Sequence, residues 1–179
     1  MNTIARVMKQ GLVQIYTGDG KGKTTAALGL ALRAAGRGLK VFIAQFAKGM
    51  FYGELEALKR FESQITLHQY GRKCFIHDEP TEEDIRLARE GWREIQEIMD
   101  GGEYDLLIVD EIGIALHYRL VTLEEVRELI RRKPETVELV LTGRKIPEEL
   151  YPQADLVTEM LEIKHYYNAG VQARKGIEF

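Results

Sequence analysis

Apolar, β-branched runs alternate along the chain with segments whose apolar residues recur at helical spacing. This alternation predicts a parallel sheet with helices packed against it. Most of the runs are continuously hydrophobic, as expected for strands that are covered on both faces. The predicted strands are Leu12–Tyr16, Lys40–Phe46, Ile65–Gln69, Asp105–Val109, Val137–Leu141 and Leu156–Ile163. The pattern therefore predicts an α/β fold with a mostly parallel central sheet of about six strands and helices on both faces.

Segments of helical periodicity lie between these runs. The first covers Ala26–Ala35. A longer one, from about Thr81 to Asp100, begins with a threonine suited to the N-cap, and three acidic residues follow it. Its apolar residues form one stripe at three- and four-residue spacing, so we expect Trp92 in the core rather than against a ligand. A third segment begins with a capping box at Thr122 and ends before Pro134.

Length and composition limit the class of protein. The 179 residues suit one ordinary domain, and we expect residues 1–179 to form it. The formal net charge of −3 argues against general nucleic-acid binding, which usually shows a basic excess. A single cysteine, Cys74, excludes an internal disulfide and favours a reducing compartment. Because no stretch is typical of a signal peptide or a membrane span, we expect a cytoplasmic protein that binds no membrane.

A glycine-rich segment joins the first predicted strand to the first helix. Its glycines allow backbone conformations that turn consecutive N–H groups inward around phosphate oxygens, and the helix N-terminus adds partial positive charge. Lys23 supplies a full charge, which we expect on an exposed loop side chain, and Thr24 supplies a hydroxyl able to bind Mg²⁺. We therefore predict that this segment binds a nucleotide triphosphate, most simply that of ATP. The residues that we expect to contact it are Gly18, Asp19, Gly20, Lys21, Gly22, Lys23, Thr24 and Thr25.

The segment departs by one position from the common phosphate-loop pattern. That pattern places a glycine five residues before the glycine of Gly-Lys-Thr, which here is Gly22. The expected position is Thr17, and the glycine stands at Gly18 instead. An ordinary glycine-rich turn without a ligand is the alternative, but strand, Gly-Lys-Thr and helix occur in the required order. We expect the departure to affect how the nucleotide lies more than whether it binds.

Two carboxylates follow the fourth predicted strand. Asp110 and Glu111 stand at the carboxyl end of the sheet, where ligands bind in open α/β folds and where the phosphate loop also emerges. Either carboxylate, together with Thr24, could hold Mg²⁺ directly or through water. Asp110 could instead cap a helix. Glu111 could polarise water for ATP hydrolysis, so Lys23 and Glu111 are the candidate catalytic residues.

Other candidate site residues have weaker support in the sequence. Lys48 and Arg144 follow the second and fifth predicted strands, and each could contact phosphate or be a solvated surface residue. His165 and Arg174 have less support still. The four histidines are scattered, and no catalytic triad or structural zinc spacing is present. The chemistry is therefore phosphoryl transfer or a reaction that needs little acid–base help.

Taken together, these segments resemble the P-loop type of ATP:corrinoid adenosyltransferase, which attaches an adenosyl group to the cobalt of vitamin B12 compounds. The similarity covers nearly the full length in the right order. The displaced glycine and the C-terminal segment are its most specific parts. The matching segments are Gly18–Thr25, Gln45–Gly49, Asp105–Glu111 with Ile114 and Ala115, Leu141–Arg144, Ala154–Met160, Lys164 with His165, and Ala169–Phe179.

The resemblance implies a RecA-like P-loop fold, a homodimer, ATP with Mg²⁺ or Mn²⁺, and a corrinoid substrate reduced to Co(I). It also implies that ATP lies reversed in the loop, that cobalt attacks C5′ and that triphosphate leaves whole. Lys21 and Lys23 would stabilise the leaving triphosphate, and Thr24 with an acid at Asp110 or Glu111 would hold the metal. An electron-donor protein such as a flavodoxin would be a further partner.

One segment departs from the family pattern. Many members carry Gly-Phe-Thr-Trp after the third strand, whose aromatics are associated with displacement of the lower cobalt ligand. Here Phe75 fits the aromatic position and His77 stands in place of the tryptophan, so both are candidate corrinoid contacts. Residues 71–80 could instead form only a variable surface loop. A P-loop ATPase or kinase, or a nucleotide-binding sensor without turnover, is the alternative for the whole chain.

Overall fold

The computed structural model describes residues 8–72, 76 and 79–179, and its framework is a six-stranded sheet. The strands lie in the order β3-β2-β4-β5-β1-β6, and each neighbouring pair is parallel. The predicted α/β fold is confirmed, and the sheet is wholly rather than mostly parallel. The strands are β1 (Val13–Thr17), β2 (Val41–Phe46), β3 (Ile65–Tyr70), β4 (Leu106–Asp110), β5 (Glu138–Thr142) and β6 (Leu156–Glu159).

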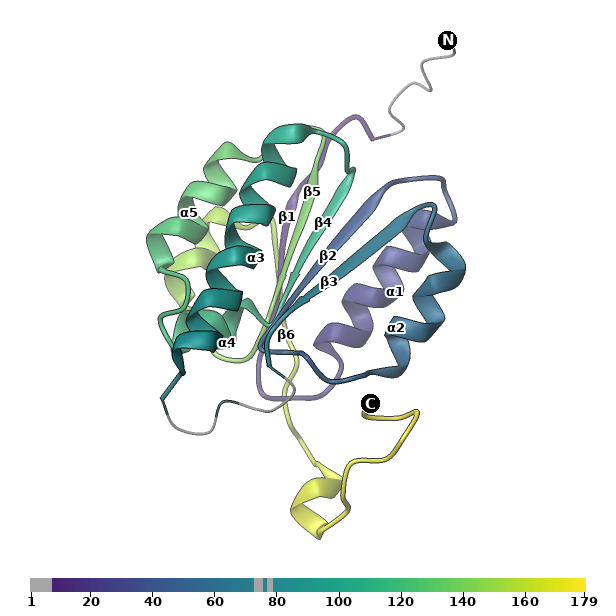
Figure 1. The fold of residues 1–179 in the computed structure, drawn as a ribbon, viewed down its shortest axis with the longest axis vertical. Helices are drawn as coiled ribbons and strands as arrows, with labels where there is room; N and C mark the ends of the chain where they lie inside the picture. The colour runs from purple at the N-terminus through teal and green to yellow at the C-terminus, as the bar shows by residue number, and fades with distance from the viewer. Residues whose placement is uncertain (1–7, 73–75, 77–78) are drawn as a thin grey trace.

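Helices cover both faces of this sheet. Helices α1 and α2 lie on one face, and α3, α4 and α5 lie on the other (Figure 1). The α-helices are α1 (Lys23–Ala35), α2 (Gly53–Leu58), α3 (Glu82–Gly101), α4 (Ile112–His117) and α5 (Leu123–Arg132). Short 3-10 helices are η1 (Lys59–Phe61), η2 (Glu148–Gln153) and η3 (Tyr166–Ala169). None of the helices in the described ranges is long and apolar enough to cross a membrane.

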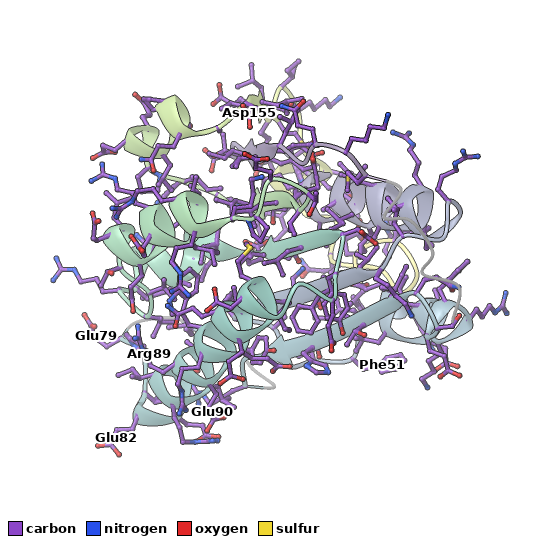
Figure 2. All side chains as sticks on the ribbon, turned by 90° about the horizontal axis from the view of Figure 1, so that it is seen from above. Phe51, Glu79, Glu82, Arg89, Glu90 and Asp155 are labelled. Carbon is purple, nitrogen blue, oxygen red and sulfur yellow. The ribbon has the colours of Figure 1, made fainter. Side chains whose placement is uncertain are left out.

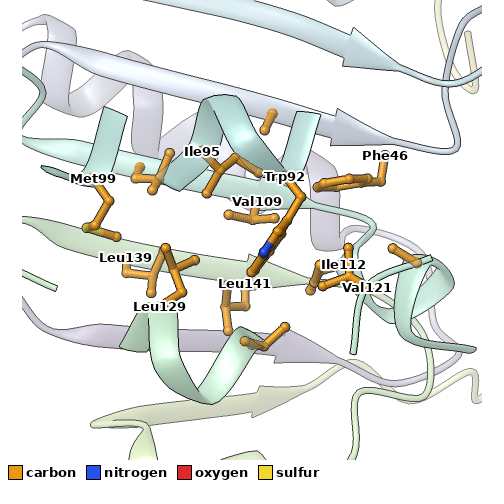
Figure 3. Packing of buried hydrophobic residues seen from close by; sticks show 14 of the residues in the cluster. Phe46, Trp92, Ile95, Met99, Val109, Ile112, Val121, Leu129, Leu139 and Leu141 are labelled. Atoms are coloured by element: carbon orange, nitrogen blue, oxygen red, sulfur yellow. The ribbon is translucent and has the colours of Figure 1, made fainter. Parts of the chain in front are cut away.

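The core between the sheet and α3 is centred on Trp92. Its side chain is 1% exposed and lies among Phe46, Ile112 and Leu141 (Figure 3). The prediction that this tryptophan belongs to the core is therefore confirmed. A second core, rich in alanine from α1, fills the opposite face. Because α1 presents alanines such as Ala27 and Ala31 to the strands, the helix that follows the phosphate loop packs close against the sheet.

Local signals place two of the helices correctly. Thr81 caps α3 and Thr122 caps α5, and both have reciprocal capping boxes, with Asp84 and Glu125 as the partners. Charged residues such as Glu82, Arg89 and Glu90 lie along α3 at the periphery of the molecule (Figure 2). Arg89 contacts Glu125 at 2.7 Å, so the outer surfaces of α3 and α5 are joined by an ion pair.

Two boundaries differ from the prediction. Helix α1 begins at Lys23 rather than Ala26, because the phosphate loop leads directly into its first turn. Strand β6 ends at Glu159 rather than Ile163, and all four of its residues are exposed at the sheet edge. The apolar residues Leu161 and Ile163 continue the sequence pattern past the strand. The chain nevertheless leaves the sheet after Met160 and crosses the phosphate loop, where the Gly20 amide donates to the Met160 carbonyl oxygen. The carboxyl ends of the strands and the C-terminal segment thus lie at the same end of the molecule (Figure 1).

Candidate active site

The glycine-rich segment connects β1 to α1. Gly18 and Gly22 have φ angles of +92° and +124°, which residues with side chains rarely adopt. A Cβ atom on Gly18 or Gly20 would lie 2.5 or 2.6 Å from the carbonyl oxygen of Met160. The Gly20 amide donates to that same oxygen over 2.7 Å. Position 17 carries no glycine because Thr17 is still part of β1, so the displaced glycine marks the first residue beyond the strand.

Lys23 begins α1, and its side chain folds back over the loop. Its Nζ donates to the carbonyl oxygens of Gly18 and Gly20 over 2.6 and 2.7 Å. The residue is 6% exposed, so the expectation of an exposed loop side chain is wrong. Burial lowers the pKa of Lys23, and the carboxylate of Glu111 opposes that shift. The ammonium is thus held at the loop by two neutral carbonyls, which phosphate oxygens could replace.

Asp110 is the centre of a buried polar cluster at the end of β4. Its Oδ1 accepts hydrogen bonds from the hydroxyls of Thr24 and Thr142, at 2.9 and 2.6 Å. Its Oδ2 accepts from Lys48 Nζ at 2.7 Å and from Gln45 Nε2 at 3.2 Å. The carboxylate is 1% exposed. Its donors come from α1, from β2 and the turn after it, and from β5, so it ties the phosphate loop to the sheet.

The alternative role of Asp110 as a helix cap is wrong, because Glu111 is the residue that precedes α4. Glu111 has a φ angle of +60°, and its amide donates to the hydroxyl of Thr142 over 3.1 Å. This conformation directs the chain away from the strand, and Glu111 lines the cavity beside the loop. Burial raises the pKa of its carboxyl, and the neighbouring negative charge of Asp110 adds to the shift.

Lys48 and Arg144 both reach the cavity, as predicted from their strand ends. The Lys48 side chain is 13% exposed and lies between Asp110 and Thr24, with its ammonium 5.5 Å from the ring centre of Tyr52. Burial alone would lower the pKa of Lys48, but the carboxylates of Asp110, Glu111 and Glu54 together more than offset this, and the pKa is raised. Arg144 is exposed and follows Gly143 at the end of β5.

The cavity beside the phosphate loop has a volume of about 470 Å³. Of the residues predicted to contact nucleotide, Gly18 and Asp19 lie outside its lining. The others line it: Gly20, Lys21, Gly22, Lys23, Thr24, Thr25, Lys48 and Arg144. His165, a weaker candidate, also lines it, whereas Arg174 does not.

The C-terminal segment forms the outer wall of the cavity and was not predicted to do so. Lys21 Nζ donates to the carbonyl oxygen of Ile177 over 3.2 Å and lies 3.4 Å from the carboxylate of Glu178. Glu178 also accepts hydrogen bonds from the hydroxyl of Tyr166 and from the amide of Arg174. No local pattern marks these contacts in the sequence, because Lys21 and Glu178 are 157 positions apart. Tyr52 and Glu54 are further lining residues that sequence reasoning missed.

The polar groups fit a hard divalent cation that shares its ligands with a nucleotide. The described residues contain no group of three or more His, Cys, Asp or Glu side chains suited to a metal. They do offer the Thr24 hydroxyl beside the Asp110 carboxylate, and Glu111 on the cavity wall. Mg²⁺ is typically bound by one or two carboxylates together with substrate phosphates rather than by a complete protein cage. The donor set therefore suits Mg²⁺ or Mn²⁺ in company with a triphosphate.

The predicted corrinoid contacts, Phe75 and His77, lie outside the described residues. Two other residues of the same loop, Arg72 and Ile76, are described. Arg72 contacts Asp84 at 2.7 Å, and the carbonyl oxygen of Ile76 accepts a hydrogen bond from the hydroxyl of Tyr118 at 3.1 Å. These two residues therefore contact α3 and the residue after α4.

Comparisons with known proteins show which family the chain is similar to. The family model described as ATP:corrinoid adenosyltransferase BtuR/CobO/CobP matches residues 9–179. A corrinoid adenosyltransferase of a Sinorhizobium species is 36% identical, over 96% of this chain and 81% of the relative. Proteins of the same name from Escherichia coli K12 and Pseudomonas aeruginosa are 34% and 33% identical, over 96% of this chain and 87% and 85% of their own lengths.

Proposed function

The chain belongs to the ATP:corrinoid adenosyltransferase family, and on that premise we propose that it transfers the adenosyl group of ATP to Co(I) of a corrinoid with release of intact triphosphate. Membership makes the protein a transferase that acts on a corrinoid. The oxidation state of cobalt, the bond that breaks in ATP and the residues that assist are the proposed parts.

The observation that carries the proposal is the set of four cationic side chains at the cavity beside the phosphate loop. The cavity is lined by Lys21, Lys23, Lys48 and Arg144, together with the carboxylates of Glu54, Glu111 and Glu178, and the N-terminus of α1 faces it. In the proposed reaction the cobalt electron pair forms the Co–C5′ bond while the C5′–O5′ bond breaks. The electron pair of that bond leaves on the triphosphate, so negative charge accumulates where these cations lie. Donors placed at a developing charge stabilise the transition state more than the ground state.

The same reaction explains why the site needs no general base. Co(I) attacks as a nucleophile that carries no proton, so the protein must orient C5′ and receive a charged leaving group. Lys21 and Lys23, together with the loop amides, are placed for the second task. The reversed position of ATP in the loop is proposed on family grounds alone.

A divalent cation would complete the charge balance. Thr24, with Asp110 or Glu111, would hold Mg²⁺ or Mn²⁺, and the ion would neutralise part of the triphosphate charge. Phe75 and His77 remain the proposed corrinoid contacts. A homodimer, a cytoplasmic location and an electron-donor protein such as a flavodoxin are also proposed, on family grounds alone.

ATP hydrolysis is the second candidate function. It is favoured by Glu111, a partly buried carboxyl of raised pKa on the cavity wall, where a water-polarising group could lie. One assay separates the two. The protein is incubated with ATP, Mg²⁺ and chemically reduced cobalamin, and the cobalt spectrum is followed before and after illumination. Adenosyl transfer gives a light-sensitive Co–C product, whereas formation of ADP and phosphate without that product would favour hydrolysis.

A further inference from the structure

A lysine ammonium lies where the proposed divalent cation would bind. Nζ of Lys48 is 2.7 Å from Oδ2 of Asp110 and 3.2 Å from Oγ1 of Thr24. Thr24 and Asp110 are the groups that we propose as metal ligands. We propose that Lys48 fills the cation position of the free enzyme and moves onto the triphosphate when metal and nucleotide bind, so that the two ligands bind as a coupled pair. This inference rests on the proposed role of Thr24 and Asp110.

The backbone directs Lys48 toward this position. Ala47 has a φ angle of +52°, so the chain turns sharply at the end of β2. The turn is packed against the start of the next loop, because a Cβ atom on Gly49 would lie 2.0 Å from the carbonyl oxygen of Gly71. A Cβ atom on Gly71 would in turn lie 2.5 Å from the backbone nitrogen of Lys48. The backbone on both sides of Lys48 is therefore closely packed, and the long side chain is the part of the residue that can change position most easily.

Two cations cannot share the Asp110 carboxylate and the Thr24 hydroxyl at these distances. Mg²⁺ binds oxygen at about 2.0–2.1 Å and demands near-octahedral geometry, so it would need the space that the ammonium fills. Repulsion between the two positive charges is strong in a buried site, where water screens poorly. The hydroxyl already donates its proton to Oδ1 of Asp110, so its remaining lone pairs are what Lys48 or a metal would use. Binding of the metal therefore requires Lys48 to leave.

The cavity gives Lys48 another place to go. Lys48 lines the space of about 470 Å³ beside the phosphate loop, and its four-carbon stem ends in three rotatable donors. With a triphosphate in that space, the ammonium gains phosphate oxygens as partners in exchange for Asp110. Without a triphosphate, a metal would displace it into solvent or toward Lys23 and Arg144. Metal and triphosphate should thus tighten each other's binding by the same factor.

The test measures Mn²⁺ binding by electron paramagnetic resonance, with inorganic triphosphate as the second ligand and no corrinoid. Wild-type protein is compared with Lys48→Met, which removes the charge at similar length, and with Lys48→Gln, which can still donate to Asp110. Lys145→Met is the matched control, because Lys145 is an exposed lysine outside the lining of the cavity. Circular dichroism and thermal unfolding establish that each variant is folded.

Without triphosphate, we expect Lys48→Met and Lys48→Gln to bind Mn²⁺ at least tenfold more tightly than wild type. Addition of triphosphate should tighten Mn²⁺ binding at least tenfold in wild type and in Lys145→Met, and much less in the two Lys48 variants. Equal or weaker Mn²⁺ binding by the Lys48 variants in the absence of triphosphate would overturn the proposal. Because no corrinoid is present, the Mn²⁺ binding result can be interpreted even if the separate cobalamin assay shows no adenosyl transfer.

Discussion

The inner and outer walls of the cavity are built in different ways. The inner wall is the cluster of Thr24, Lys48, Asp110 and Thr142, whose members come from α1, the turn after β2, β4 and β5 and are largely buried. The outer wall is the C-terminal segment, residues 162–179, whose side chains are mostly exposed and whose hydrogen bonds are largely internal. Its described polar contacts with the phosphate loop run through Lys21.

The inner wall is therefore formed before substrate binds, whereas the outer wall can form together with the substrate. The inner wall is held by the strand order, so its geometry is as stable as the fold except at the Lys48 side chain, which we propose to move. The outer wall is held by a few exposed contacts, which contribute little to stability in water. We therefore expect changes to the inner wall to affect both catalysis and unfolding, and changes to the outer wall to affect substrate affinity alone.

Lys23→Ala should have the largest effect on activity. Removal of an ammonium that faces the leaving triphosphate should lower kcat/KM at least 100-fold, or about 3 kcal/mol in the transition state. The fold should persist, because the hydrogen bonds that are lost join the side chain to carbonyls of its own loop. Steady-state adenosylation of reduced cobalamin, with circular dichroism as the folding control, measures both. Activity within threefold of wild type would remove Lys23 from the reaction.

Asp110→Asn should have the largest effect on stability. The change leaves the Lys48 ammonium without its partner in a largely buried position, which typically costs about 3 kcal/mol. The double variant Asp110→Asn with Lys48→Met removes both charges and should recover most of that loss. Urea unfolding of the wild type, both single variants and the double variant gives the coupling free energy. Additive losses in the double variant would show that the pair does not interact as described.

Removal of the outer wall should have a smaller effect. A chain ending at Leu161 keeps β6 and the Met160 contact with Gly20 but loses Glu178. We expect KM for ATP to rise about tenfold, which corresponds to about 1.4 kcal/mol, with little change in the urea midpoint. The point variant Glu178→Gln is the milder companion. A large fall in the urea midpoint of the truncated chain would instead show that the outer wall contributes to the stability of the core.

The smallest expected effect is a loosening of the outer wall at low pH. Hydrogen bonds from Arg174 and Tyr166 lower the pKa of Glu178 to about 2. A lowered folded-state pKa means that the contacts are fully present above the ordinary glutamate value of about 4.3 and weaken as pH falls toward 2. NMR signals of the Arg174 and Glu178 amides should therefore be unchanged from pH 7 to 5 and broaden or shift below 4. Loosening already between pH 7 and 5 would contradict this assignment.

The sequence predicts the parts of this molecule that depend on neighbouring residues. The caps at Thr81 and Thr122 follow from spacing within one helical turn, and the core position of Trp92 follows from the stripe on α3. The phosphate loop could be found because its glycines, Lys23 and Thr24 are contiguous. Its resemblance to a known family then predicted the transferase class that the comparisons show.

Contacts between distant segments could not be predicted in the same way. Lys48 meets Asp110 because β2 and β4 are neighbours, with Gln45 opposite Asp110 in register, and that order is a property of the whole sheet. The apolar residues Leu161 and Ile163 extend the pattern of β6 although the chain has already left the sheet, so the predicted strand was too long. The burial of Lys23 likewise depends on the path of the loop.

Identification of the leaving group decides whether the protein transfers the adenosyl group of ATP with release of whole triphosphate. The protein is incubated with ATP, Mg²⁺ and reduced cobalamin, and phosphorus NMR of the quenched mixture is compared with the amount of Co–C product. We expect one intact triphosphate for each adenosyl group transferred, with Lys23→Ala slowing both together. ADP and phosphate in place of triphosphate, or triphosphate without a Co–C product, would contradict it.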